Sequence, residues 1–431
     1  MTVEASTTAP ASLWRHRDFL RLWAGDTISQ LGTQVTLLAV PLLAIKVLHA
    51  TPFQVGLLTT CETAAFLLIG LPSGAWVDRM RRRNVLIVND LVRAVVLGSL
   101  PLAAWLDMLS LPQVYAVVLL VGVCTVFFDV AYQSYLPHLV GREHLVEGNA
   151  KLQGSQSVSQ VAGPSVGGFL VQALTAPYAI LLDAASYLWS ASWIIAIRKR
   201  EPRPERGAER HLVAEMKEGL TFVLRHRLLR AITACTGSSN LATSAAMVAL
   251  ISLLASPRQL NLSAGTIGVL FTVGSAGGVL GAVLARRFAQ WVGQGQAIWI
   301  SGGLWAPTAF VAPFVQHGWT LGLLAVAQLV GSVGIVIYNI TQVSFRQGLC
   351  PERLLGRMNA TIRFLVWGTM PLGGLIGGAL GSWIGLRPTL LVTAVAGVLA
   401  VLPVYLSPLR TMRELPQTYE EENAPTGPSG G

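Results

Sequence analysis

Three carboxylates lie within long apolar stretches of this 431-residue chain: Asp26, Glu62 and Asp183. Asp26 and Glu62 have no basic residue within four positions. An ionisable side chain at such a place is costly to bury, so it is a functional candidate by default. A low-dielectric site disfavours the charged form of a carboxyl group. The chemistry that these positions could perform is therefore reversible protonation near neutral pH. Otherwise they are polar cavity groups or members of buried pairs.

Polar side chains recur at helical spacing around the first of these carboxylates. Asp26, Gln30 and Thr33 are separated by four and three residues, so they share one face of a helix. Comparable stripes follow later in the chain, through Thr236, Asn240 and Ser244 and through Gln328, Ser332 and Asn339. Such stripes predict the polar lining of a cavity.

Two arginines also lie inside apolar stretches. Arg363 could attract an anionic substrate or balance a carboxylate, and it is a further candidate for the cavity. Arg93 stands three residues after Asp90, so the two can pair on one helix face, and we interpret them as structural.

Other catalytic chemistry is not indicated. The sequence contains no GxxxxGK[ST], no HExxH and no CxxC, and its four cysteines lack metal-ligand spacing. An enzyme would show clustered histidines or carboxylates at one interface, whereas most of the seven histidines fall in loops. We expect neither an enzyme nor a cofactor or metal site.

The elements that must position these residues are membrane helices. Hydrophobic residues make up 52% of the chain and charged residues only 12%, whereas soluble proteins carry about a quarter. A bilayer core needs about 20 apolar residues per helix. Twelve such runs occur, at 20–47, 54–77, 84–106, 112–136, 149–173, 177–197, 227–255, 264–288, 296–316, 319–345, 355–383 and 386–407.

Charge sets the orientation. Of the 31 Lys and Arg residues, 26 lie in loops on the side of the termini, three lie on the other side and two lie inside spans. By the positive-inside rule both termini are cytoplasmic. The net charge of +10 thus reflects loops facing an anionic leaflet rather than nucleic acid. We expect a multi-pass protein of the inner membrane without a cleavable signal peptide.

The runs group into two six-helix halves. The expected units are a cytoplasmic segment 1–18, a first bundle 19–197, a linker 198–226 with an interfacial helix, a second bundle 227–410 and a disordered tail 411–431. Short matches between the halves recur at offsets near 207–210 residues. They include Glu143-His-Leu145 against Glu352-Arg-Leu354, which indicates duplication. Parallel repeats place a binding site near the midplane between them.

The loop after the second run carries Gly74-x-x-x-Asp78-Arg79-x-Arg81-Arg82-Arg83. It resembles the loop motif of the major facilitator superfamily, with an arginine where glycine is usual, as in the multidrug, macrolide and enterobactin-exporter branch. The resemblance covers Leu13 to about Arg410. In this motif a carboxylate near a helix N-terminus would stabilise a closed cytoplasmic gate. The arginines are expected to pair with Asp129. A plain topology anchor is the alternative. The gate candidates are Gly74, Asp78, Arg79, Arg82, Arg83 and Asp129.

A second motif lies in the fifth run, as Gly163-Pro164-Ser165-Val166-Gly167-Gly168. It resembles the family's exporter motif, although two upstream glycines are replaced by Ala150 and Ser159. Pro164 removes a backbone hydrogen bond, and the glycines allow close helix contact. The result could be a rigid seam that seals one pathway, or ordinary small-residue packing.

The resemblance implies an all-α fold of two pseudo-symmetric bundles in which the first, fourth, seventh and tenth helices line a central cavity. It further implies a monomer that exports a small amphipathic compound, such as a drug, antibiotic or siderophore, in exchange for protons. Two alternatives stay open. A symporter or importer would show a strongly polar cavity, and a lipid flippase would show a similar cavity to an exporter.

The orientation is testable with reporter fusions. We expect fusions after residue 431 and within 198–226 to report a cytoplasmic location, because the basic loops lie on that side. A periplasmic signal from the fusion after residue 431 would contradict the twelve-span topology.

Overall fold

The computed structural model describes residues 13–70, 72–141, 144–199, 201, 212–350 and 352–413, and these residues form helices without any strand. The first half contains α1 (Arg17–Leu42) with a π-helical turn at Leu43–Val47, α2 (Pro52–Ile69), α3 (Pro72–Asp78), α4 (Arg82–Trp105), α5 (Leu111–Val140), α6 (Leu145–Leu174) and α7 (Ala176–Ala196). The expected tail and most of the expected N-terminal segment lie outside the described residues.

The second half follows the surface helix α8 (Leu212–Arg225). It contains α9 (Arg227–Ala255), α10 (Ala264–Val292), α11 (Gln294–Trp305) with a 3₁₀ segment at Ala306–Phe314, α12 (Trp319–Leu349), α13 (Glu352–Trp367), α14 (Thr369–Trp383) and α15 (Leu386–Tyr405). Two expected spans are broken. The run 54–77 divides between α2 and α3, where Gly70 precedes Pro72, and the run 355–383 divides at Gly368.

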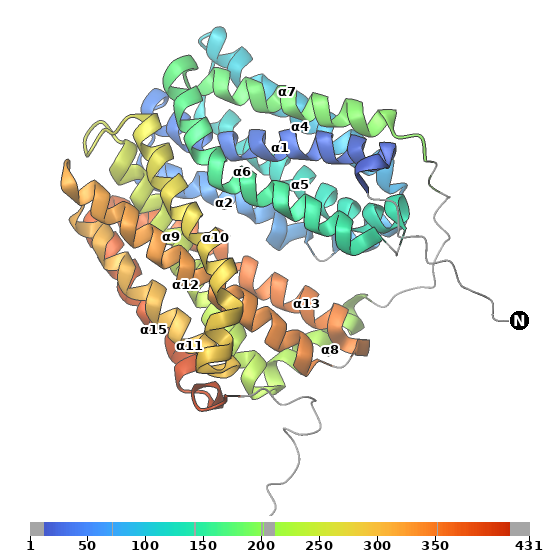
Figure 1. The fold of residues 1–431 in the computed structure, drawn as a ribbon. Coiled ribbons are helices and arrows are strands. Elements are labelled where there is room, and N and C mark those ends of the chain that lie inside the picture. Colours follow the sequence, from blue (N-terminus) through green and yellow to red (C-terminus); the bar gives the residue numbers. More distant parts are fainter. Residues whose placement is uncertain are drawn as a thin grey trace, which may run out of the picture.

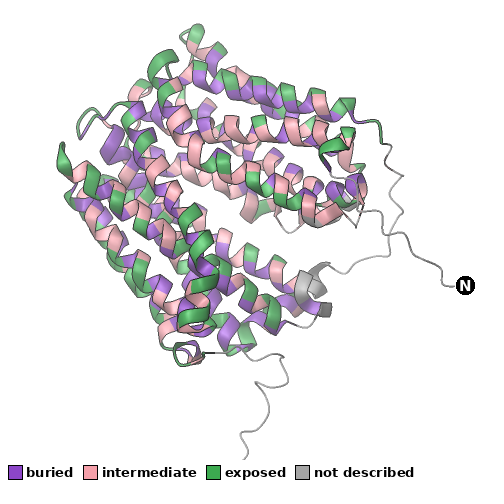
Figure 2. Ribbon diagram, in the orientation of Figure 1, coloured by how far each residue is buried: buried purple, intermediate pink, exposed green. Residues whose placement is uncertain are grey.

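Eleven of the expected spans are long and apolar enough, among the described residues, to cross a membrane. The remaining one, α6, is 30 residues long and packs between α1 and α10, but polar side chains lower its hydropathy. Exposed residues recur along many helices (Figure 2), and they include many bulky apolar ones. Exposed tryptophans stand near helix ends at Trp105, Trp291, Trp319 and Trp383. This pattern is typical of a lipid-facing surface with interfacial aromatic belts.

The two halves meet at one end and diverge at the other (Figure 1). We name the first the closed end, which contains the connections at 48–51 and 256–263, and the second the open end, which contains the starts of α1 and α9. One buried apolar cluster joins both halves at the closed end, from Leu38 and Leu42 of α1 to Leu253 of α9 and Ile267 of α10. Toward the open end each half has a separate cluster.

Glycines bring the backbones of opposite halves together at the closed end. On α2, a Cβ atom at Gly56 would lie 2.8 Å from Cα of Gly378 on α14. On α6, a Cβ atom at Gly168 would lie 3.0 Å from Cα of Gly268 on α10. Without a hydrophobic driving force between helices in lipid, such close packing is a main source of association.

Hydrogen bonds between the halves reinforce this seam. Lys46 Nζ donates to the Leu262 carbonyl at 2.6 Å, and Thr60 Oγ1 donates to the Pro371 carbonyl at 2.9 Å. The backbone N–H of Gly265 donates to Gln172 Oε1 at 3.1 Å. The closed end is therefore sealed by polar as well as steric contacts.

Gly56→Ala should weaken the closed end, because its new methyl group would press on the α14 backbone. We expect a loss of about 1–3 kcal/mol in the contact, seen as a lower melting temperature and faster labelling of a cysteine introduced at residue 48. Gly322→Ala is the control, because a Cβ atom there would meet no heavy atom within 4 Å. Equal behaviour of the two variants would contradict the seam.

Candidate binding cavity

A cavity of about 800 Å³ opens toward the open end, mainly among helices of the first half. Fourteen of its nineteen lining residues are polar or charged: Asp26, Ser29, Gln30, Thr33, Gln34, Arg93, Thr125, Asp129, Tyr132, Gln133, Asn149, Gln153, Gln156 and Arg363. The other five are Phe128, Leu136, Ala150, Leu152 and Trp367. Polar and charged residues thus predominate in number along the cavity wall, although apolar groups still form much of its surface.

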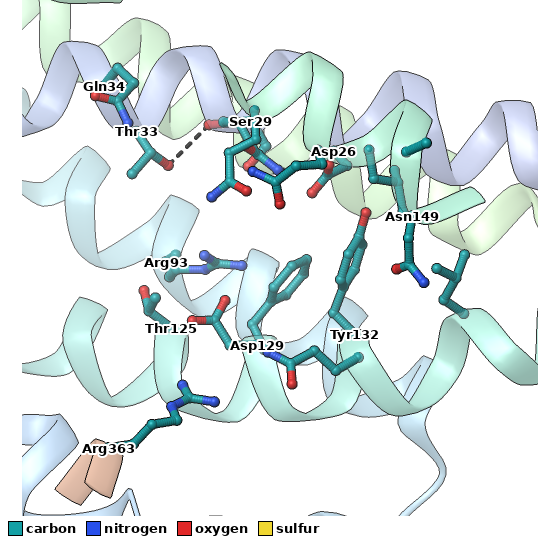
Figure 3. A pocket seen from close by; sticks show the side chains of 18 of the residues that line it. Asp26, Ser29, Thr33, Gln34, Arg93, Thr125, Asp129, Tyr132, Asn149 and Arg363 are labelled. Atoms are coloured by element: carbon teal, nitrogen blue, oxygen red, sulfur yellow. Dashed lines mark hydrogen bonds between the residues drawn. The ribbon is translucent and has the colours of Figure 1, made fainter. Parts of the chain in front are cut away.

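The expected stripe of α1 forms one wall (Figure 3). Asp26 is only 6% exposed, and Gln30 Nε2 donates to its Oδ2 at 2.8 Å. Tyr132 of α5 lies opposite this carboxylate (Figure 3). The Thr33 hydroxyl forms hydrogen bonds with the Ser29 carbonyl and with the Tyr187 hydroxyl, each at 3.0 Å. The structure therefore places Asp26, Gln30 and Thr33 together, as the spacing predicted.

A second polar wall comes from α6. Asn149, Gln153 and Gln156 are separated by four and three residues, so they lie on one helix face, and all three line the cavity. The sequence interpretation missed them. The signal was available as amides at helical spacing in an otherwise apolar run, and these amides also lower the hydropathy of α6.

Arg93 lines the cavity and contacts one carboxylate and two aromatic rings. It pairs with Asp90 of the same helix, and the two side chains are 5% and 0% exposed. Its guanidinium stacks over the rings of Phe128 and Tyr187, at 4.3 Å from each centroid. The structure confirms the expected pair, which fixes α4 against α5 and α7.

The other carboxylate candidates do not line this cavity. Asp183 of α7 is fully buried, accepts a hydrogen bond from Ser186 at 3.0 Å and lies against Gly32 of α1. Glu62 of α2 is half-buried, and its backbone carbonyl packs against Gly122 of α5. Of the three, only Asp26 is both buried and part of the cavity wall.

The second half contributes two side chains, both from α13. Arg363 is exposed to the cavity and stacks over Trp367 at 4.7 Å, while Trp367 meets Phe66 of α2 edge to face at 4.9 Å. Arg363 faces Asp129 of α5 across the opening (Figure 3). A hollow of about 200 Å³ behind this pair also contains Gly74.

The polar stripes of α9 and α12 do not reach this cavity, contrary to expectation. Asn240 donates to the Val366 carbonyl at 3.3 Å. Gln328 lines a separate cavity of about 230 Å³ inside the second half, and Asn339 is exposed outside both cavities. The reason is that α9 and α12 turn these faces toward their own bundle and α13.

The loop arginines have partners other than Asp129. Arg82 lies 4.0 Å from Glu201, and Arg83 donates to the Ile195 carbonyl at 2.7 Å. These contacts cap the end of α7 and leave Asp129 for Arg93 and Arg363, so the expected pairing with the loop is wrong for Arg82 and Arg83. Arg79 is exposed, and the side chain of Asp78 lies outside the described residues.

The motif in α6 packs on two neighbours at once. Cβ atoms on Gly163 and Gly167 would meet Gln34 at 2.8 Å and Val35 at 3.1 Å on α1. The other face meets α10: the carbonyl of Pro164 and Gly168 abut Gly268, and Ser165 Oγ bonds Thr272 Oγ1 at 2.8 Å. The motif thus forms part of the closed-end seam.

The linker contains the helix α8, which packs against α13 of the second half. Gly219 sits against the Arg357 carbonyl of α13, Glu218 pairs with Arg357, and Val223 is buried. The helix therefore packs against the part of α13 that leads to Arg363.

Known proteins resemble this chain along most of its length. The Major Facilitator Superfamily family model matches residues 22–370. The multidrug efflux pump Tap of Mycolicibacterium fortuitum is 25% identical over 395 residues, covering 88% of this chain and 93% of the relative. The enterobactin exporter EntS of Escherichia coli O1:K1 / APEC is 27% identical over 413 residues, covering 95% and 96%.

Solved structures share the fold. A bacterial homologue of the iron transporter ferroportin in an inward-facing state has a TM-score of 0.74 at 16% identity, covering 90% of this chain and 98% of that one. Its outward-facing state scores 0.59, with the same identity and coverage. The nucleoside transporter NupG scores 0.73 at 12% identity, covering 90% and 98%.

Arg93→Met should destabilise the protein, because it leaves the buried Asp90 without its cation. We expect a loss of about 3–5 kcal/mol for the single variant, measured as thermal unfolding of the purified protein. Asp90→Asn combined with Arg93→Met removes both charges and should recover part of that loss.

Lys151→Ala is the control, because its ion pair with Glu147 is partly exposed and contributes up to about 1 kcal/mol. A double variant less stable than the single one would show that the pair is not what stabilises this site.

Proposed function

The chain belongs to the major facilitator superfamily, and we propose that it exports a small organic compound in exchange for protons. Its family and relatives identify a multi-pass membrane transporter rather than an enzyme. Efflux is supported by the similarity to the multidrug efflux pump Tap and the enterobactin exporter EntS, which match nearly the whole chain. The proposed location is the inner membrane, with a monomer whose termini are cytoplasmic.

The observation that carries proton coupling is the position of Asp26. This carboxylate is buried, forms part of the cavity wall and has no ion pair among the described residues. It can therefore alternate between a protonated and an ionised form as the cavity is exposed to each side. Gln30 donates to one of its oxygens, so the partner of this carboxylate is a neutral amide rather than a cation.

Alternating access supplies the rest of the mechanism. The open end admits substrate from the cytoplasm while the glycine seam excludes the outside. When the halves rock, Asp129 and Arg363 approach across the opening and can form an ion pair that closes it. The loop residues Gly74, Asp78, Arg79, Arg82 and Arg83 belong to this inner gate, with Arg82 and Arg83 anchoring α3 and α4 on α7.

A second proton site is available at Asp183, which lies behind α1 and interacts electrostatically with Arg93. Glu62 lies on the other side of α5, against Gly122, and is the third candidate. Neither shares the cavity wall with Asp26, so each would act on helix packing rather than on the substrate site.

One observation favours a proton symporter that imports its solute. Fourteen of the nineteen residues that line the cavity are polar or charged, so the cavity offers hydrogen bonds to a hydrophilic solute. A lipid flippase of the same fold stays the other alternative. Direction separates exporter from importer: an outward-directed flux against a substrate gradient, driven by an inward proton gradient, is unique to the exporter.

Asp26→Asn should abolish proton-driven efflux and leave substrate binding intact. The amide keeps the shape of the side chain but cannot exchange a proton. Uphill transport in proteoliposomes should fall to the level of empty liposomes, and substrate affinity should no longer change between about pH 6 and pH 8.

Asp183→Asn and Glu62→Gln are measured in parallel as the second and third candidates, because each removes a carboxylate outside the cavity. If Asp26→Asn exports at the wild-type rate under an imposed pH gradient, the proton site lies elsewhere. Asp183 would then be the next residue to test.

A further inference from the structure

Six side-chain amides line the cavity from three helices. Gln30 and Gln34 come from α1, Gln133 from α5, and Asn149, Gln153 and Gln156 from α6. They lie on both sides of the same space, because α1 and α6 are neighbours and α5 faces them.

Five of these amides have no hydrogen-bond partner within the part of the chain that the structure describes. Gln30 is the exception, since it donates to Asp26. Each amide offers two donors and one acceptor oxygen. Amides on the cavity wall that have no partner in the protein are available to a ligand, and each can both donate and accept.

Arg93 is committed to its ion pair with Asp90, whereas Asp26, Asp129 and Arg363 form no ion pair among the described residues. The α6 residues that line the cavity are all uncharged, so hydrogen bonding by neutral groups is the polar recognition available on that wall. An apolar strip beside the amides, formed by Leu136, Ala150 and Leu152, can hold a less polar part of the same ligand.

We propose that the transported compound is glycosylated or otherwise polyhydroxylated, and that Gln153 and Gln156 hold its hydroxyl groups. This rests on the proposed function, because it assigns the substrate class of the same cavity. A hydroxyl group matches an amide in both directions, as donor to its oxygen and as acceptor from its N–H.

The test compares matched probe pairs on the full-length protein in lipid nanodiscs. The pairs are umbelliferyl glucoside with umbelliferone, and nitrophenyl galactoside with nitrophenol. We expect each glycoside to bind about tenfold or more tightly than its aglycone. Gln153→Leu combined with Gln156→Leu should reduce that ratio to near one by weakening only the glycoside.

Gln290→Leu is the control, because Gln290 is exposed on α10 and lies outside the cavity lining. If the leucine variant is not monodisperse, Gln153→Asn with Gln156→Asn replaces it, since the shorter amides stay polar but lose reach. The proposal is overturned by equal binding of glycoside and aglycone, by an unchanged ratio in the double variant, or by no binding of any probe.

The proton-coupling experiment keeps the two proposals separate. Binding preference and proton-driven flux are both measured on the wild type, so neither readout depends on a variant in the cavity wall. A kept preference without any proton-driven flux in the wild type would refute the exporter and leave the substrate class standing. Proton-driven flux without a preference for the glycoside would support the exporter and refute the proposed substrate class.

Discussion

Close approach of glycine backbones at the closed end is the constraint on which the rest of the structure depends. Gly56 against Gly378 and Gly168 against Gly268 let two bundles share one apolar core. Because the shared core is confined to that end, the opposite end separates and admits water. Water in turn allows polar side chains to line the space without the cost of an unpaired group in lipid.

The polar cavity shows how a membrane protein can keep several ionisable groups between its helices. Asp90 neutralises Arg93, and two aromatic rings cover the guanidinium. With Arg93 occupied in this way, Asp26 is left with an amide as its partner rather than a cation. Replacing a cation by an amide keeps the carboxylate able to change charge, which a fixed ion pair would oppose.

The fold could be predicted largely from composition, because apolar runs of sufficient length have one solution in a bilayer. Asp26, Gln30 and Thr33 were found because helical spacing is visible in sequence. The partners of Arg82 and Arg83 could not be predicted, because these contacts depend on where the end of α7 lies in the fold. The polar stripes of α9 and α12 were predicted to line the central cavity, but they do not. Helical spacing predicts which residues share a face, but not which neighbour that face contacts. The amides of α6 were not predicted, although they lie at the same helical spacing as the stripes of α1, α9 and α12.

The asymmetry of the cavity suggests how binding and rocking are linked. Almost all of its lining belongs to the first half, so a ligand is held there, next to Asp26. Among the described residues, the second half lines this cavity through α13 alone. This helix is separated from α14 at Gly368 and packs against α8. A ligand or proton that changes the charge near Asp129 acts directly on Arg363, and thus on α13. Substrate and proton can therefore bias the same movement from one wall of the cavity, and no contact between the proton site and the bulk of the second half is required.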